Sequence, residues 1–214
     1  GLVKYAKPAG VIASLIPMTN PAMTPPVTGV SSANARNAVI FSPHPRTAAT
    51  TCEMSRIMRA ACHAVGAPED LFQCIERPSI PMTQYLMESC DLTLATGGKP
   101  MVQAAYSSGK PAYGVGAGNS TIVVDETADL NEAAKNIMIS KTSDFGSGCS
   151  ADGNIVIQKS IYRNMVSELK ASNGYLCNSA EKELLSRVMW DDKENRTFST
   201  IACKPQQLAL VAGF

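Results

Sequence analysis

Short apolar runs alternate with segments of helical length through the first half of the chain. The runs that predict strands end in loops of glycine, proline or small polar residues, and they cover residues 11–16, 38–41, 71–75, 92–95 and 112–115. Residues 47–65 carry apolar side chains at spacings of three and four, the period of an amphipathic helix, and Gly66 is placed to end it. Shorter helices are predicted at 82–89 and 101–107. This alternation favours crossover connections and an open parallel α/β sheet.

The second half of the chain alternates in the same way. Its pattern predicts a strand at 121–125, a helix at 130–141, a glycine-rich loop at 143–153, a strand at 154–158, helices at 161–170 and 180–188, and a charged surface loop at 190–197. Asp129 is the expected N-cap of the first of these helices. We therefore expect two α/β domains, one over residues 1–118 and one over residues 119–214.

Four loops follow the predicted strands of the first half, at 17–21, 42–46, 96–98 and 114–119. All four are rich in Gly, Pro, Ser, Thr or Asn, which ordinary turns also use. In an open parallel sheet the carboxyl ends of the strands meet at one edge, and ligands bind there. The four loops together predict a cofactor cleft, although none contains the GxGxxG fingerprint or the GK[ST] ending of a phosphate loop.

Composition and charge narrow the classes of partner. The chain has 19 Lys and Arg against 18 Asp and Glu, a net charge of +1, so no field of one sign exists to gather nucleic acid or an acidic membrane. Hydrophobic residues make up 45% of the 214 residues, as in a globular protein with a core. The apolar runs are too short to cross a bilayer, and the first residues lack the pattern of a signal peptide. We expect a soluble intracellular protein that binds neither nucleic acid nor membrane.

The seven cysteines are scattered and include no CxxC pair, so we predict no metal site and no redox dithiol. Disulfides are not expected without export, and most of the thiols should be small core hydrophobes. Cys149 differs from the rest because glycines flank it in a loop just before a strand, where a substrate could approach its sulfur. Spacing alone leaves open whether it is a nucleophile or an ordinary loop cysteine. Of the two histidines, His63 is assigned a structural role, whereas His44 lies in a loop of the predicted cleft.

Six segments in order closely resemble the CoA-acylating branch of the aldehyde dehydrogenase superfamily, in which a Rossmann-like parallel sheet is followed by an α/β catalytic domain. The segments are 16–21 (IPMTNP), 37–46 (NAVIFSPHPR), 94–98 (LATGG), 104–111 (AAYSSGKP), 114–119 (GVGAGN) and 125–130 (DETADL). Two further stretches, 73–80 and 172–176, are most similar to acylating sulfoacetaldehyde dehydrogenases. The resemblance implies that residues 1–118 bind NAD or NADP and that residues 119–214 are the thiol-bearing catalytic domain.

The resemblance also implies a reaction, in which a small aldehyde, NAD(P)+ and coenzyme A give acyl-CoA and NAD(P)H. Cys149 would be the nucleophile that forms a thiohemiacetal and then a thioester, and the side-chain amide of Asn20 would hold the oxyanion together with the Cys149 amide. The implied cofactor contacts are Ser42, Pro43, His44, Pro45, Thr96, Gly97 and Gly116. A homo-oligomer in the full-length form and a cytoplasmic location, with a bacterial microcompartment as a variant of it, are implied as well.

Residues 114–118 (GVGAG) stand where the hydrolytic branch carries the glutamate that activates water, so a thioester would wait for coenzyme A. Departures from the family pattern occur at 143–146 (SDFG), Asp152, Lys99-Pro100 and Pro25-Pro26, where the prolines should interrupt the helix after Asn20. Family members are about twice as long, so the chain is a fragment, an incompletely determined sequence or a truncated relative. A non-catalytic nucleotide-binding or assembly subunit and a hydrolytic enzyme are the competing interpretations.

Overall fold

The computed structural model describes residues 1–3, 5, 7–116 and 118–214. Its contacts divide the chain into two compact units, residues 1–117 and residues 118–214, which we describe one at a time. Ala117 of the predicted 114–119 loop lies outside the described residues.

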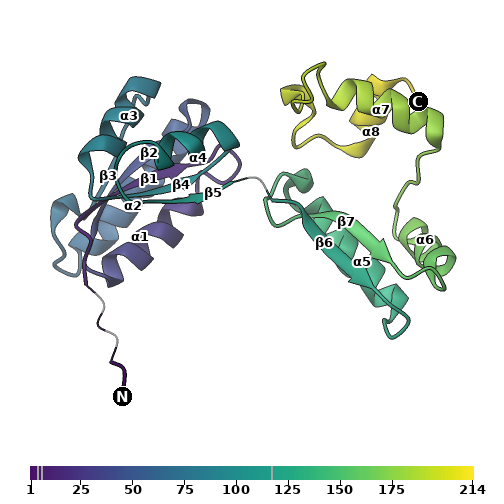
Figure 1. Cartoon of the computed structure of the whole chain (residues 1–214), viewed down its shortest axis with the longest axis horizontal. Coiled ribbons are helices and arrows are strands. Elements are labelled where there is room, and N and C mark those ends of the chain that lie inside the picture. The colour runs from purple at the N-terminus through teal and green to yellow at the C-terminus, as the bar shows by residue number, and fades with distance from the viewer. Residues whose placement is uncertain (4, 6, 117) are drawn as a thin grey trace. The chain divides into compact units, whose positions relative to one another are not determined.

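The first unit is built on a five-stranded parallel sheet (Figure 1). Its strands are β1 (Val11–Ile16), β2 (Ala38–Pro43), β3 (Phe72–Cys74), β4 (Leu92–Thr96) and β5 (Ala112–Val115), and they lie in the order β3-β2-β1-β4-β5. All four pairings are parallel. The predicted strands, the open parallel sheet and the Rossmann-like class are confirmed.

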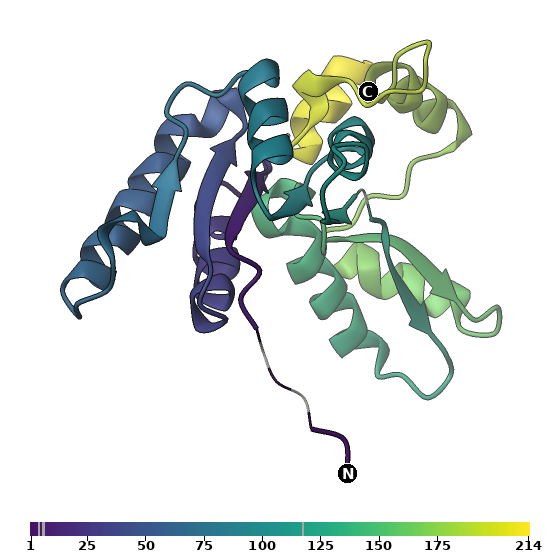
Figure 2. The same ribbon diagram turned by 60° about the vertical axis from the view of Figure 1, so that its left-hand side comes forward.

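Helices cover both faces of this sheet, so β1 and β2 are buried on both sides. The helices are α1 (Thr24–Asn34), α2 (Ala48–His63), α3 (Ile80–Ser89) and α4 (Lys99–Tyr106). Alternate residues of β1 point to opposite faces. Ile12 and Ile16 pack with Phe41, Phe72 and Met58 beneath α1 and α2. Figure 2 shows the ribbon of the sheet and its helices from a second side. On the other face, Leu15 and Ala13 pack under α3 and α4.

The prolines at 25 and 26 do not interrupt a helix, contrary to the sequence prediction. Helix α1 begins at Thr24, so both prolines lie in its first turn, where backbone N–H groups have no intrahelical acceptor. The first bond of the helix runs from the N–H of Val27 to the carbonyl of Met23. The segment after Asn20 is therefore a turn followed by a helix, and the proline pair sets where that helix starts.

Asn37 joins the starts of β1 and β2. Its buried side chain accepts hydrogen bonds from the N–H groups of Ala9 at 2.6 Å and Gly10 at 2.9 Å. Its amide nitrogen donates to the carbonyls of Ser32 and Ala35 at the end of α1. Four backbone groups that need partners thus meet one side chain, which fixes the register of the two central strands.

The second unit contains a two-stranded parallel sheet of β6 (Ser120–Val124) and β7 (Asp152–Ile157). Its helices are α5 (Leu130–Thr142), α6 (Tyr162–Ala171), α7 (Ser179–Met189) and α8 (Pro205–Ala212). Val124, Ala134, Ile137 and Met165 form its core, between the sheet, α5 and α6. Asp129 accepts a hydrogen bond from the N–H of Glu132 at 3.0 Å, which confirms its predicted N-cap role.

Two sequence expectations about the cysteines are wrong. Cys52 and Cys74 form a disulfide, although disulfides were not expected. Among the cysteines, only Cys90 is fully buried, so most of the thiols are not core residues.

Helix α8 was not predicted from the sequence. Among the described residues, no helix combines the length and apolar character that crossing a bilayer requires.

Candidate functional site

The loops after β1, β2, β4 and β5 all leave the same edge of the first unit's sheet, because the strands are parallel. The N–H of His44 donates to the carbonyl of Ile16 at 3.2 Å, and the N–H of Gly97 donates to the carbonyl of Val115 at 3.1 Å. Backbone bonds thus join the loop after β2 to the end of β1, and the loop after β4 to the end of β5. The candidate residues of the first half therefore gather at one edge, as the sequence predicted.

Asn20 follows β1 and Thr96 ends β4, and these two strands lie side by side at the centre of this edge. Successive strands run outward from β1 through β2 to β3, and outward again from β4 to β5. The chain direction across the sheet therefore reverses between β1 and β4, and open α/β sheets bind their ligands at such a reversal. Asn20 follows β1 and is exposed, while its carbonyl accepts hydrogen bonds from the N–H and hydroxyl of Thr24.

The four candidates in the loop after β2 differ in exposure. Ser42 and Pro43 are the buried last residues of β2, and the Ser42 hydroxyl lies 2.9 Å from that of Thr83 on α3. His44 and Pro45 are exposed. The first pair thus supports the loop from beneath, and the second pair is the part that a ligand can contact. Thr83 was not singled out from the sequence, and only its inward place on a short helix could have indicated it.

The imidazole of His44 has a defined orientation. Its Nδ1 accepts a hydrogen bond from the N–H of Arg46 at 3.2 Å, so the neutral ring carries its proton on Nε2. The His44 carbonyl accepts from the hydroxyl of Thr47 at 3.3 Å. Nε2 is then the donor that a ligand hydroxyl or phosphate could use. His63, which was assigned a structural role, is the exposed last residue of α2.

The loops after β4 and β5 expose backbone rather than long side chains. Thr96 and Gly97 are half-buried and lead through Gly98 into α4, whose first turn contains Lys99 and Pro100. A Cβ built on Gly116 meets nothing within 4 Å, so a ligand can approach this backbone closely. Open backbone beside a helix N-terminus is the environment that phosphate groups prefer in proteins.

Gly114 serves packing rather than ligand access. A Cβ there would lie 2.5 Å from Cγ1 of Val102 and 3.0 Å from the ring of Tyr106. The N–H of Gly114 also donates a hydrogen bond to the Tyr106 hydroxyl at 3.0 Å, which holds the strand against this side chain. Glycine at this position lets β5 lie close against α4.

Cys149 lies in a tight connection between α5 and β7 in the second unit. Asp144, Phe145 and Gly146 all have positive φ values, of 47°, 53° and 70°. A Cβ on Gly146 would lie 2.9 Å from the carbonyl oxygen of Lys141, so glycine is needed where the chain turns away from the helix. Non-glycine residues in the left-handed region are uncommon in proteins, and those that occur are concentrated at functional sites.

The Cys149 thiol is exposed and stands outside the disulfide, as the sequence predicted for its access. A Cβ on the preceding Gly148 would meet nothing within 4 Å. The turn is held on its far side by Asp152, whose N–H donates to the Ser140 hydroxyl at 3.3 Å and whose carboxylate accepts from the Ser120 hydroxyl at 3.0 Å. The Cys149 thiol therefore lies in a loop whose end at Asp152 is held by two hydrogen bonds.

Gly118 and Cys149 are neighbours at the start of the second unit's sheet. A Cβ on Gly118 would lie 3.9 Å from the Cys149 carbonyl oxygen, and one on Gly153 would collide with the side-chain amide of Asn119. Cys149 thus lies at the amino ends of β6 and β7. The predicted closeness of Asn20 and Cys149 joins residues of the two separately described units, and it stays a prediction.

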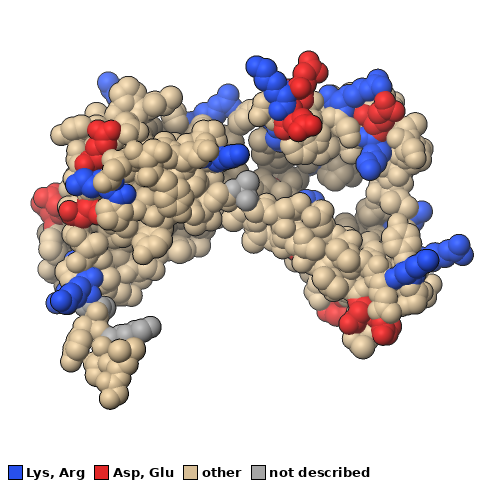
Figure 3. Space-filling view, viewed as in Figure 1, with Lys and Arg blue, Asp and Glu red and all other residues tan. Residues whose placement is uncertain are grey.

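Charges are mixed rather than concentrated. Acidic and basic side chains are interspersed on the face shown in Figure 3. This mixture agrees with the net charge of +1.

Comparisons with known proteins bear on these loops. The family model described as "Aldehyde dehydrogenase family" matches residues 2–176. A sulfoacetaldehyde dehydrogenase from an Acholeplasma species is 45% identical over 187 residues, which cover 87% of this chain and 38% of that relative.

Solved structures of relatives have the same fold. The crystal structure of an acetylating aldehyde dehydrogenase from Geobacillus thermoglucosidasius has a TM-score of 0.93 at 39% identity, and the match covers 98% of this chain and 46% of that one. A Rhodopseudomonas palustris propionaldehyde dehydrogenase, solved with bound CoA and an acylated cysteine, has a TM-score of 0.88 at 31% identity, over 97% of this chain and 48% of that one. This chain therefore spans less than half the length of each of these three relatives.

Proposed function

The chain belongs to the aldehyde dehydrogenase family, and we propose that it is the nucleotide-binding and thiol-bearing part of a CoA-acylating aldehyde dehydrogenase. The observation that carries the proposal is the exposed Cys149 thiol in its tight, glycine-flanked turn. The acylated cysteine in the Rhodopseudomonas relative supports the same chemistry. The substrates are a small aldehyde, coenzyme A and NAD or NADP.

In the proposed reaction, the Cys149 thiolate adds to the aldehyde carbon and the carbonyl oxygen becomes an oxyanion. The side-chain amide of Asn20 and the N–H of Cys149 donate hydrogen bonds to that oxygen, which stabilises the charge as it develops. Bound NAD(P)+ supplies the acceptor for the hydride that leaves this carbon. The acyl group then stays on Sγ as a thioester until the thiol of coenzyme A displaces Cys149 and carries the acyl group away.

The residues at the sheet edge fit a dinucleotide. We assign His44 and Pro45 to the adenosine ribose, with Nε2 of His44 as a donor. Thr96 and Gly97 fit the pyrophosphate, because their backbone adjoins the N-terminus of α4. Gly116 fits a close backbone contact further along the cofactor. Ser42 and Pro43 are the other contacts that the resemblance implies in this loop, and the buried Ser42–Thr83 hydrogen bond supports the loop there.

The glycine-rich connection favours transfer to coenzyme A over hydrolysis. Hydrolysis of a thioester needs a base that activates water, and residues 114–118 offer no carboxylate for that role. Gly118 follows Val115, the last residue of β5, by three positions and faces the Cys149 carbonyl. The homo-oligomeric state and the cytoplasmic location remain predictions from the family resemblance.

The test is CoA-dependent reduction of NAD+ or NADP+ by the purified protein with acetaldehyde and with sulfoacetaldehyde. Turnover with acyl-CoA as the product supports the proposal, and turnover without coenzyme A would instead indicate a hydrolytic enzyme. Cys149→Ser should lose turnover, whereas the matched variant Cys62→Ser, in α2, should keep it. Full turnover in Cys149→Ser, or no binding of either nucleotide by the unmodified protein, would overturn the assignment.

A further inference from the structure

Cys52 and Cys74 lie 22 positions apart, yet their Cα atoms are 5.3 Å apart in the folded chain. The parallel pairing of β2 and β3 sets Cys74 opposite Phe41, at the end of β3 where the strand leaves the sheet. Helix α2 packs on the same face and brings Cys52 to this point. A Cα separation of this size permits a disulfide without backbone movement. Both residues are half-buried, so neither lies in the closed core of the unit.

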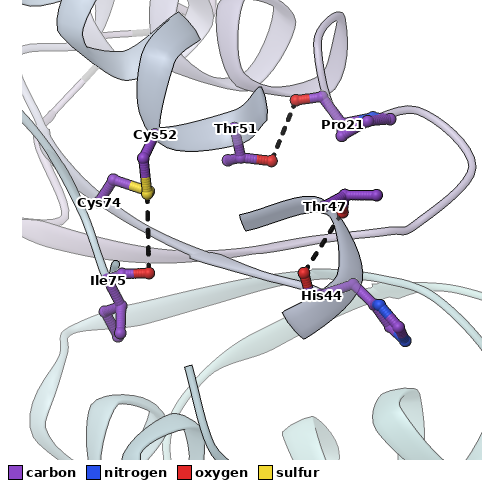
Figure 4. Close-up of a disulfide and its surroundings, with 7 residues drawn as sticks. All are labelled: Pro21, His44, Thr47, Thr51, Cys52, Cys74 and Ile75. Carbon is purple, nitrogen blue, oxygen red and sulfur yellow. Dashed lines mark hydrogen bonds between the residues drawn. A yellow bond between two sulfur atoms is a disulfide. The ribbon is translucent and has the colours of Figure 1, made fainter. Parts of the chain in front are cut away.

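The same part of α2 contacts the loops of the proposed nucleotide site. The hydroxyl of Thr51 donates to the carbonyl of Pro21 at 3.2 Å, in the loop that carries Asn20. The hydroxyl of Thr47, just before the helix, donates to the carbonyl of His44. Figure 4 shows these contacts beside the disulfide. The start of α2 is thus tied to the loop after β1, the loop after β2 and the end of β3.

The reduced pair also has a partner in this fold. Sγ of Cys52 lies 3.7 Å from the carbonyl oxygen of Ile75. A disulfide sulfur has no hydrogen to donate, but a thiol at the same place can donate weakly to that carbonyl. The surroundings therefore accommodate both the dithiol and the disulfide. In reducing compartments, where we expect this protein, disulfides are mostly transient and redox-sensing.

We propose that Cys52 and Cys74 are a reversible redox site at which a low-molecular-weight disulfide oxidises the pair and thereby tightens dinucleotide binding. The inference rests on the proposed function, because the ligand is the dinucleotide of that site. One cysteine thiolate attacks a sulfur of the small disulfide, forms a mixed disulfide and releases one small thiol. The second cysteine then attacks the protein sulfur and releases the other. The pair loses two electrons and the small disulfide gains them.

The bridge acts by restraining the helix that holds both loops. With the disulfide closed, α2 cannot shift from β3, so the contacts to Pro21 and His44 keep the loops in their binding arrangement. With the dithiol, core packing and hydrogen bonds hold that arrangement without a covalent restraint, and part of the binding free energy goes into ordering it. Ordering costs of this kind predict an affinity about three- to tenfold weaker for the reduced protein.

The experiment uses the protein with Cys149→Ser, so that oxidants do not act on the proposed nucleophile. One sample is oxidised with glutathione disulfide and another reduced with dithiothreitol, and the reagents are removed. Alkylation followed by peptide mass spectrometry reports whether the pair is bridged. Calorimetric titration with NAD+ and NADP+ then gives the affinity of each form. The variant with Cys52→Ser and Cys74→Ser is the control, and Cys62→Ser is a matched change of a third cysteine in the same helix.

We expect the bridged form to bind the dinucleotide about three- to tenfold more tightly than the reduced form. The affinity of the paired-serine control should be the same after either treatment, and Cys62→Ser should show the same difference as the parent protein. Equal affinity in the two forms, no bridge under glutathione disulfide, or the same response in the paired-serine control would each overturn the redox inference alone. Absence of nucleotide binding in every form would overturn the proposed function together with it.

Discussion

The hydrogen bond between Ser42 and Thr83 separates a structural role from a ligand role in the loop after β2. Ser42 belongs to a motif that implies cofactor contact, yet it is 4% exposed and its hydroxyl lies 2.9 Å from that of Thr83. Ser42→Ala leaves the Thr83 hydroxyl buried without this partner, and Thr83→Val does the converse. Removing one partner of a buried hydrogen bond costs about 1–3 kcal/mol, so each variant should unfold at lower temperature, by about 2–4 °C per kcal/mol.

The double variant refines this prediction. If the two hydroxyls serve mainly each other, removing both should cost less than the sum of the two single changes, with a coupling of about 1 kcal/mol. Thermal unfolding and calorimetric NAD+ binding on the same samples provide the readouts. Thr50→Ala, which removes an exposed hydroxyl of α2, should change stability by less than about 0.5 kcal/mol. The reasoning is refuted if Ser42→Ala leaves stability unchanged and weakens nucleotide binding tenfold or more while Thr83→Val does not.

Two further predictions concern side chains that organise backbone. Asn37→Ala removes the acceptor for the N–H groups of Ala9 and Gly10 and should lower the free energy of unfolding by about 2–4 kcal/mol. Asn37→Asp keeps an acceptor and should lose less. Equal urea midpoints for both variants and the parent protein would contradict this prediction. The side-chain and backbone hydrogen bonds from Thr127 hold the pKa of Asp125 below its usual value, so this stabilisation is present above the pKa of the unfolded state, about 4, and is lost as the pH falls through the lower folded pKa. Thr127→Val should raise the pKa of Asp125 in a carboxyl-carbon NMR titration, and an unchanged pKa would argue against that hydrogen bond.

The strands of the first unit were predictable because each is short, apolar and closed by a loop of turn residues. Each predicted strand matches an observed one to within two residues at either end. The order of the strands was not predicted, since periodicity identifies an element without identifying its neighbours. Burial on both faces of β1 and β2 also hides from the sequence which side chains point to which layer, so the contact between the Ser42 and Thr83 hydroxyls was not predicted.

Helix α8 shows a signal that was present and not used. Pro205 begins the helix, where its missing N–H does no harm, and Gly213 ends it with a φ of 92°. The apolar residues between them are contiguous and carry no polar alternation, so the period of a helix was not visible. The Cys52–Cys74 pair shows the opposite case, because no local pattern brings residues 22 positions apart into contact. That contact depends on the pairing of β2 with β3 and on the packing of α2.

The motifs that carry the family resemblance include residues whose role in the fold is clear from their contacts. Asn37 holds the strand starts, Gly114 admits α4 against β5, and Asp129 caps α5, so each of these is explained by the fold alone. Asn20 and Cys149 are different: both are exposed, both lie in turns that other residues fix, and no fold requirement in the described residues explains the amide of one or the thiol of the other. Residues that the fold does not explain are the ones to test for chemistry. On this argument, serine at position 149 should leave folding unchanged while turnover is lost, and a fall in stability with turnover retained would place Cys149 among the structural residues instead.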